Sequence, residues 1–176
     1  MDQKYRVRVS HDDFNFSAAH FIVFEHGVCE PLHGHNYRVQ VEIEGPLDGN
    51  CFVIDFTELS SIVRHVLREL NHRTLLPTQH PEIKLESSEN EIEVRYGGRR
   101  WTFPRSDCAL LSLENTTAEL LALHVAERVL GELDRQAADA NRQHGFLAIH
   151  VEIEEARGQT ATCSLFPPDA EDDPEA

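Results

Sequence analysis

The stretch from residue 37 to residue 44 alternates between apolar and polar side chains. Its apolar members are Tyr37, Val39, Val41 and Ile43. A period of two is typical of a half-buried strand, in which residues two apart face the same side of a sheet. A second alternation over 5–17, interrupted around His11, predicts one long strand or two short ones before it.

Two later stretches show the three-to-four-residue apolar spacing of amphipathic helices. The first follows Asp55, with Glu58 three residues later, which suits a capped helix start, and we expect it to end near Leu70. The second follows the capping-box pattern of residues 116–119 and should run to about Leu133.

Further strands are predicted in the second half of the chain. Residues 89–96 and 99–103 flank Gly97-Gly98, a good two-residue turn, and so predict a hairpin. Partly apolar runs at 146–155 and 160–166 predict two final strands. The element order is therefore strand, strand, helix, helix, strand, strand, with the hairpin as an addition, which indicates an α+β fold.

The length of 176 residues predicts one domain that is large enough to bury a core. We expect this domain to span residues 1–167, with an insertion at about 78–110. Residues 168–176 form an acidic tail that we expect to be disordered. The formal net charge of −15 repels phosphate backbones, so we expect no nucleic-acid binding.

The start of the chain lacks an apolar segment of the signal-peptide type, and no run of about 18 apolar residues exists. We therefore expect a cytoplasmic protein that does not bind membranes. The 4 cysteines lack CxxC spacing and are expected to be free thiols in a reducing compartment.

The candidate chemistry centres on two histidines, His33 and His35, at the start of the strand over residues 37–44. Their spacing places both on one face, and antiparallel pairing with the preceding strand would bring His20 opposite them. Three neutral imidazoles are a common ligand set for catalytic zinc because they leave a fourth position for water or substrate. Each of them alone could equally be an ordinary surface or core histidine.

Three other residues have both a chemical and a structural interpretation. Cys29 could be a base or nucleophile if a metal or a cation lowers the pKa of its thiol. Alternatively, it could be a small buried hydrophobic residue. His72 could belong to a proton relay, or could lie favourably at a helix C-terminus. Glu155 follows a row of apolar residues on one strand face, where a carboxylate needs a partner. It could bind a guanine-like or pterin ring, or it could reach solvent at the end of the strand.

Three further candidates for the site are charged residues. The Glu119 carboxylate suits a helix cap. Arg38 and Arg73 suit phosphate contacts, or an ordinary exposed surface.

Six motifs follow one another along the chain. They are Phe16–His20, Cys29–Tyr37, Val53–Phe56, Leu70–Arg73, Thr116–Glu119 and the late strand glutamate Glu155. Together they resemble the 6-pyruvoyltetrahydropterin synthase / 6-carboxytetrahydropterin synthase family. The resemblance covers nearly the whole chain outside residues 78–110 and the tail, and its most specific part is the histidine pair with its upstream cysteine.

The resemblance implies a tunnelling fold (T-fold), an antiparallel four-stranded sheet with two antiparallel helices on one face. It implies a homo-oligomer, a barrel-like hexamer with active sites at subunit interfaces. The implied substrate is 7,8-dihydroneopterin triphosphate, and the implied cofactor is Zn²⁺.

By the same resemblance, the zinc ligands are His20, His33 and His35. Cys29 is implied to be the catalytic base, and His72 with its neighbour Asn71 the proton-transfer group. Glu155 would anchor the pterin ring in a pocket lined by Thr117 and Glu119. The family usually has aspartate where this chain has Asn71, so either another acid replaces it, from the insertion or a neighbouring subunit, or the activity is altered.

The spacing between Cys29 and His33 resembles the 6-carboxytetrahydropterin synthase branch of queuosine and deazapurine biosynthesis. The expected activity is a lyase reaction that releases acetaldehyde and triphosphate and leaves a carboxylate on C6. The alternatives are a 6-pyruvoyltetrahydropterin synthase, a variant that cleaves dihydroneopterin, and a non-catalytic module that binds zinc and a pterin or purine. A small metal-binding protein unrelated to pterins is a further, weaker alternative.

Overall fold

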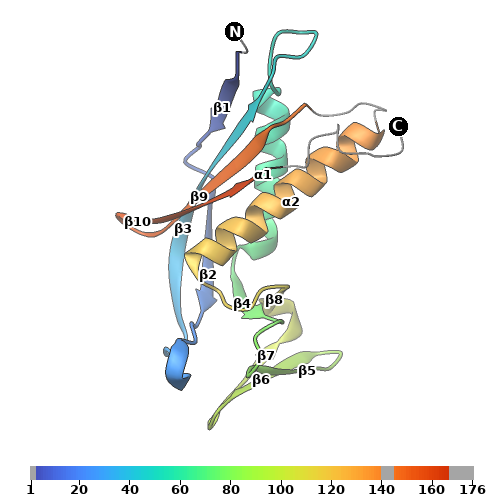
Figure 1. Cartoon of the computed structure of the whole chain (residues 1–176). Helices are drawn as coiled ribbons and strands as arrows, with labels where there is room; N and C mark the ends of the chain where they lie inside the picture. Colours follow the sequence, from blue (N-terminus) through green and yellow to red (C-terminus); the bar gives the residue numbers. More distant parts are fainter. Residues whose placement is uncertain (1–2, 140–144, 167–176) are drawn as a thin grey trace, which may run out of the picture.

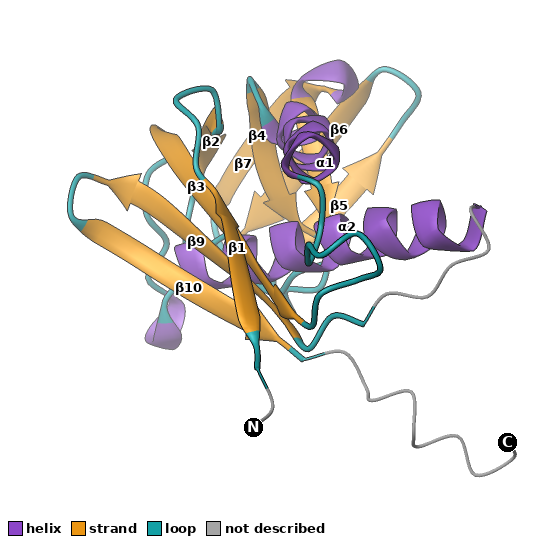
Figure 2. Cartoon of the chain, turned by 90° about the horizontal axis from the view of Figure 1, so that it is seen from above, coloured by secondary structure: helices purple, strands orange, loops and turns teal. Residues whose placement is uncertain are grey.

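The computed structural model describes residues 3–139 and 145–166. Among these residues, two α-helices lie on one face of a large sheet (Figures 1 and 2). They are α1 (Phe56–Leu70) and α2 (Ala118–Asp139). The expected acidic tail, residues 168–176, lies outside the described residues.

The large sheet has seven strands in the order β10-β9-β3-β2-β4-β8, with β1 paired to the second half of β3. The strands are β1 (Tyr5–Val9), β2 (Asn15–His20), β3 (His33–Gly45), β4 (Arg73–Pro77), β8 (Cys108–Leu111), β9 (Ala148–Ala156) and β10 (Gln159–Leu165). The α+β class is confirmed. The sheet is larger than the expected four antiparallel strands, because β4 and β8 extend it by parallel pairing.

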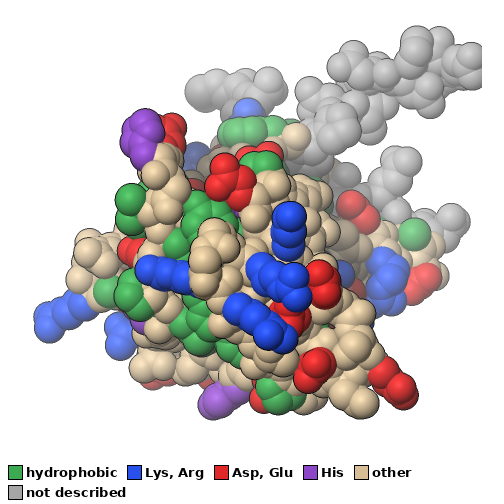
Figure 3. Space-filling model, turned by 90° about the horizontal axis from the view of Figure 1, so that it is seen from below, with side chains coloured by type: hydrophobic (Ala, Val, Ile, Leu, Met, Phe, Trp, Pro, Cys, Tyr) green, Lys and Arg blue, Asp and Glu red, His purple; other side chains and the backbone are tan. Residues whose placement is uncertain are grey.

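The segment between β4 and β8 forms a separate three-stranded sheet, called here the inserted sheet. It consists of β5 (Lys84–Ser87), β6 (Glu91–Tyr96) and β7 (Arg99–Pro104). The predicted hairpin is confirmed as β6 and β7, and Gly97 at its turn has a φ of +54°, which favours glycine. The inserted sheet forms the lower end of the molecule in Figure 1, and that end carries both basic and acidic side chains (Figure 3).

Both helices begin as their sequences predict, with one difference of register. The Asp55 carboxylate accepts hydrogen bonds from the backbone N–H groups of Thr57 and Glu58, at 2.7 and 3.1 Å. Helix α2 is capped by Thr117, whose hydroxyl accepts from the Leu120 N–H at 3.4 Å, so Thr116 is free for another contact. Helix α2 also continues six residues beyond the expected end at Leu133, as far as Asp139.

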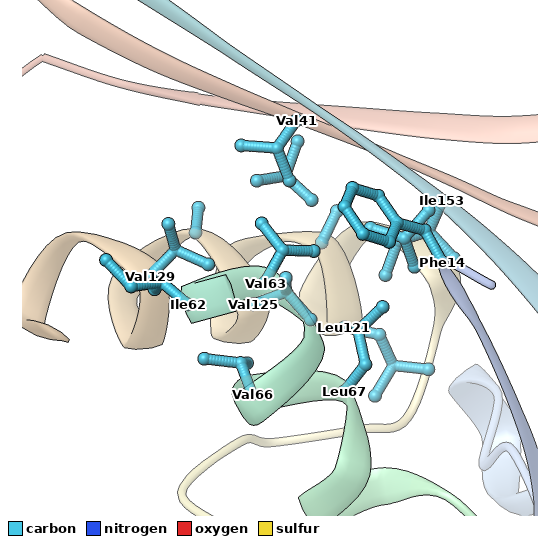
Figure 4. Close-up of a cluster of buried hydrophobic side chains, with 14 of the residues drawn as sticks. Phe14, Val41, Ile62, Val63, Val66, Leu67, Leu121, Val125, Val129 and Ile153 are labelled. Carbon is cyan, nitrogen blue, oxygen red and sulfur yellow. The ribbon is translucent and has the colours of Figure 1, made fainter. Parts of the chain in front are cut away.

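The main core lies between the helices and the sheet (Figure 4). Branched aliphatic side chains of α1 and α2 meet the apolar face of β3 and β9, and the members labelled there include Val41, Ile62, Val63, Val125 and Ile153. Burial of each such side chain contributes about 1.5–3 kcal/mol. This packing makes the pairing of β2 with β3 a rigid support for the residues at its lower end.

Candidate metal and active site

The three predicted histidines meet where β2 ends and β3 begins. The antiparallel register places His20 directly opposite His33, and Ala18 opposite His35. One ring nitrogen from each imidazole lies within 4.8 Å of the other two. Gly34 allows this pairing, because a Cβ atom there would lie 3.0 Å from the carbonyl oxygen of Ala18.

Backbone carbonyls orient two of the three rings. Nδ1 of His20 lies 2.9 Å from the Thr116 carbonyl oxygen, and Nδ1 of His33 lies 2.9 Å from that of Pro31. A carbonyl oxygen accepts a hydrogen bond from a protonated Nδ1, which leaves the lone pair on Nε2 for a metal ion. Metal-binding histidines normally donate their other ring N–H to such an oxygen, so the donor set suits a divalent transition metal.

The cluster is closed on one side and open on the other. The His20 side chain is fully buried, whereas those of His35 and His33 are 24% and 38% exposed. Burial lowers the pKa of His20, against the opposing effects of the Thr116 carbonyl and Glu155, so this imidazole is neutral at pH 7. A ligand could therefore enter from the side of His33 and His35.

The Glu155 carboxylate lies beside the histidines. Its Oε1 is 3.4 Å from Nε2 of His20 and 4.0 Å from Nε2 of His35. The buried Tyr37 hydroxyl donates to the same oxygen at 3.2 Å, and burial raises the Tyr37 pKa further beyond its usual range, with a contribution from Glu155. Glu155 is thus held at the edge of the cluster by a permanently protonated phenol.

Cys29 lies in the loop between β2 and β3, outside the group formed by the three histidines. Its side chain is buried, and the thiol donates a hydrogen bond to the Glu30 carbonyl oxygen at 3.3 Å. Burial raises the pKa of the Cys29 thiol, whereas the Arg99 guanidinium acts in the opposite direction. The thiol is therefore protonated at neutral pH in this state of the protein.

The residue after it, Glu30, was not predicted to matter. Its Oε2 is buried without a hydrogen-bond partner and lies 3.9 Å from Nε2 of His33. A buried carboxylate oxygen with no partner is costly, and such groups often mark sites that bind a ligand or an ion. The sequence signal was its position beside Cys29 in the most specific motif.

Asn71 and His72 lie between α1 and β4, and neither belongs to the histidine cluster. The Asn71 side chain accepts a hydrogen bond from the Ser17 N–H at 2.9 Å, and its own N–H caps the end of α1. His72 has a left-handed φ of 58° and lines a groove of about 490 Å³ together with Asp107, Arg73 and residues of β2 and β3 that include His35. Among the described residues, no hydrogen bond, ion pair or ring contact joins the His72 side chain to the three histidines.

The segment at the start of α2 contacts the site through its backbone. Thr116 is fully buried; its carbonyl oxygen faces His20, and its hydroxyl donates to the Phe21 carbonyl oxygen at 3.0 Å. Thr117 caps the helix, and Glu119 is exposed in its first turn. Arg38 is exposed and lies 3.7 Å from Glu154.

Comparison with known proteins agrees with this geometry. The sequence model of the family described as 6-pyruvoyl tetrahydropterin synthase matches residues 9–165. The chain belongs to this family. A Methanocaldococcus jannaschii relative, named putative 6-carboxy-5,6,7,8-tetrahydropterin synthase, is 35% identical over 86% of this chain and 90% of its own length. The relatives are thus tetrahydropterin synthases, enzymes of the lyase type.

Solved structures of the family share the fold. The 6-pyruvoyl tetrahydropterin synthase of Plasmodium vivax matches with a TM-score of 0.84 and 28% identity, over 94% of this chain and 99% of its own. Because the uncovered remainder is shorter than the inserted sheet, the likeness extends into that sheet. The tunnelling fold is therefore confirmed.

A third relative carries a different name. The dihydroneopterin monophosphate aldolase of Pyrococcus furiosus is 39% identical over 61 residues, which are 35% of this chain and 51% of that protein.

No helix in the described part of the chain is long and apolar enough to cross a bilayer.

Proposed function

We propose that this protein is a zinc-dependent lyase that converts 7,8-dihydroneopterin triphosphate to 6-carboxy-5,6,7,8-tetrahydropterin, in queuosine or deazapurine biosynthesis. The observation that carries the proposal is the convergence of His20, His33 and His35, two of them oriented by backbone carbonyls, beside Glu155. The names of the curated relatives, such as that of Methanocaldococcus jannaschii, support the carboxylate-forming reaction.

Zinc would be held by Nε2 of His20, His33 and His35, and when bound it would polarise the side-chain oxygens of the substrate and acidify the adjacent C–H bonds. Glu155 would accept hydrogen bonds from the ring N–H and exocyclic amine of the pterin. Thr117 and Glu119, at the start of α2, would line the same pocket.

In this proposal Cys29 removes a proton from the substrate side chain. Its thiol must first lose its own proton, which the cationic Arg99 and the bound metal favour. The proton would then be relayed by His72, which lines a groove at the protein surface. In a homo-oligomer, expected to be a cytoplasmic hexamer, that groove can face the site of a neighbouring subunit.

Asp107 would take the place of the missing family carboxylate. Asn71 holds the backbone of β2 and the end of α1, whereas Asp107 shares a groove with His72. Because both side chains line this groove, Asp107 offers His72 a carboxylate that Asn71 does not supply.

A second activity is favoured by one observation, the unpartnered Oε2 of Glu30 beside His33. A carboxylate there could act as base in an aldolase-type cleavage of the dihydroneopterin side chain. The Pyrococcus furiosus relative is named for such a reaction, and structures of the Plasmodium vivax protein carry substitutions of a glutamate described as catalytic.

One experiment separates these functions. Zinc-loaded protein is incubated with dihydroneopterin triphosphate, and separately with dihydroneopterin, and the products are identified by mass. A carboxypterin with acetaldehyde supports the main proposal, whereas a pyruvoyl product selects the synthase alternative. A hydroxymethyl pterin selects the aldolase, and bound but unreacted substrate indicates a binding module.

Two variants assign the base. Cys29→Ala should abolish formation of the carboxypterin while zinc remains bound. Glu30→Gln should instead abolish any cleavage of dihydroneopterin. Full carboxypterin formation by Cys29→Ala would contradict the role given to Cys29.

A further inference from the structure

The inserted sheet packs against the loop that carries Cys29 and Glu30. Apolar side chains of this loop and of β6 form a second core cluster, separate from the main core; its buried members are Phe21, Val23, Cys29, Leu76, Ile83, Ile92, Val94 and Tyr96. The loop therefore rests on the inserted sheet rather than on the helices. Cys29 itself belongs to this second cluster.

Two residues of the inserted sheet lie close to the start and to the tight turn of the loop. The Trp101 ring stacks on Phe21 at 4.9 Å between centroids and 12° between planes, and Phe21 directly follows the buried ligand candidate His20. At the tight turn of the loop, Gly27 has a φ of +80°, and a Cβ added there would lie 3.7 Å from the Tyr96 hydroxyl. The inserted sheet thus contacts this loop at two widely spaced points.

A third contact reaches the reactive residues. Nη1 of Arg99 donates to the Glu30 carbonyl oxygen at 2.8 Å, and the same oxygen accepts the Cys29 thiol at 3.3 Å. A carbonyl oxygen has two lone pairs and can accept both bonds. The guanidinium of the inserted sheet and the thiol of the loop therefore share one acceptor.

We propose that Arg99 is a positioning residue, which fixes the carbonyl oxygen of Glu30 and thereby holds the Cys29 thiol in place. This inference rests on the proposed role of Cys29 as the base. A bond between Arg99 and a backbone oxygen does not depend on the side chain at position 30, so the device serves either candidate base.

The charges around the thiol determine the sign of the effect. The groups that face Cys29 are the Arg99 guanidinium, the Glu30 carboxylate and the Tyr96 hydroxyl. Burial and Glu30 disfavour the thiolate, whereas Arg99 favours it through both charge and hydrogen bonding. Loss of the cation should therefore make deprotonation of Cys29 harder.

The adjacent residue supplies a matched control. Arg100 lies next to Arg99 on β7 and pairs with Glu93 on β6, on the exposed surface of the inserted sheet. Arg100→Met removes one arginine from the same hairpin without touching the loop. Arg99→Lys keeps the positive charge but loses the planar guanidinium that reaches the carbonyl.

The test compares Arg99→Met, Arg99→Lys and Arg100→Met with the parent protein, each loaded with zinc. Alkylation of Cys29 by iodoacetamide is followed between pH 7 and 11.5, and peptide mapping by mass separates Cys29 from the other three thiols. Arg99→Met should move the midpoint of the profile up by about one pH unit, because a nearby opposite charge shifts a pKa by about that amount. Arg99→Lys should show a smaller upward shift than Arg99→Met, because it keeps the positive charge. The midpoint of Arg100→Met should match that of the parent.

Turnover provides the second readout. In Arg99→Met, kcat should fall about tenfold while KM stays within about twofold, because the substrate-binding Glu155 is untouched. Identical alkylation profiles for Arg99→Met and Arg100→Met would overturn the inference. If the parent protein forms no pterin product, the proposed function fails, yet the alkylation profiles still decide the role of Arg99.

Discussion

The Tyr37 hydroxyl connects the histidine cluster to Glu155, and Tyr37→Phe would remove this group alone. The ring is fully buried and stacks on Phe16 at 4.6 Å between centroids. Phenylalanine keeps that stacking and almost the same volume, so the substitution creates no sizeable cavity. The change therefore isolates one hydroxyl.

The contacts of this hydroxyl give the expected magnitude. It donates to Oε1 of Glu155 at 3.2 Å and lies 3.2 Å from Nε2 of His20. A hydrogen bond to a charged group contributes about 1.5–3 kcal/mol. Water can partly replace it, because the Glu155 side chain is 20% exposed, so we expect a loss of about 1.5 kcal/mol in the free energy of unfolding.

The same bond should matter for substrate binding. Glu155 without its donor can turn away from the cluster, and 1.4 kcal/mol corresponds to about a tenfold change in affinity. We therefore expect KM to rise about tenfold for the pterin substrate with little change in kcat. Urea unfolding of the metal-free protein measures the stability, and steady-state kinetics of the zinc-loaded protein measure KM.

Tyr5→Phe is the control, since the Tyr5 hydroxyl donates to Gln3 on the exposed surface. It should change the free energy of unfolding by less than about 0.5 kcal/mol and leave KM unaltered. The reasoning would be refuted if Tyr37→Phe and Tyr5→Phe were indistinguishable in both stability and KM.

Three further predictions concern the metal, the pH dependence and the groove. His33→Ala should lower zinc affinity at least about 100-fold by competition with a chelator, whereas His11→Ala should not. Burial, reinforced by Arg128, lowers the pKa of His124 in the folded protein. As the pH falls below about 6.5, the unfolded chain therefore binds a proton at His124 before the folded protein does, and the folded protein loses stability. His124→Gln should therefore lose less stability than the parent between pH 7 and 5 in urea titrations. Asp107→Asn should lower kcat about tenfold, and Asp139→Asn should not.

Each of these has an opposing outcome. Full zinc binding by His33→Ala would remove it from the ligand set. Parallel losses of stability in the parent protein and His124→Gln would mean that His124 titrates alike in both states. An unchanged kcat in Asp107→Asn would leave His72 without the carboxylate proposed for it.

The histidine cluster could be predicted because its geometry depends on local rules. Alternation along β3 places His33 and His35 on one face, and β2 directly precedes β3, so antiparallel pairing brings His20 opposite. Register follows from the two apolar faces that must both meet the core. None of these steps requires knowledge of distant parts of the chain.

The residues that orient the site were harder to predict. Thr116 reaches His20 from 96 residues away, and Arg99 reaches Glu30 from 69 residues away. Such contacts depend on how α2 and the inserted sheet dock, which periodicity does not encode. Strands β4 and β8 were missed for the same reason, because each is short and pairs in parallel with a distant strand.

The inserted sheet gives a physical reason for the departure at Asn71. Asn71 is occupied by the backbone of Ser17 and by the end of α1, so a carboxylate for His72 has to come from another element. The short helical turn that ends the inserted segment brings Asp107 to the groove of His72, while β7 of the same segment brings Arg99 to the loop of Cys29. One segment thus contacts both groups proposed to move protons, and changes in its docking should affect the two together.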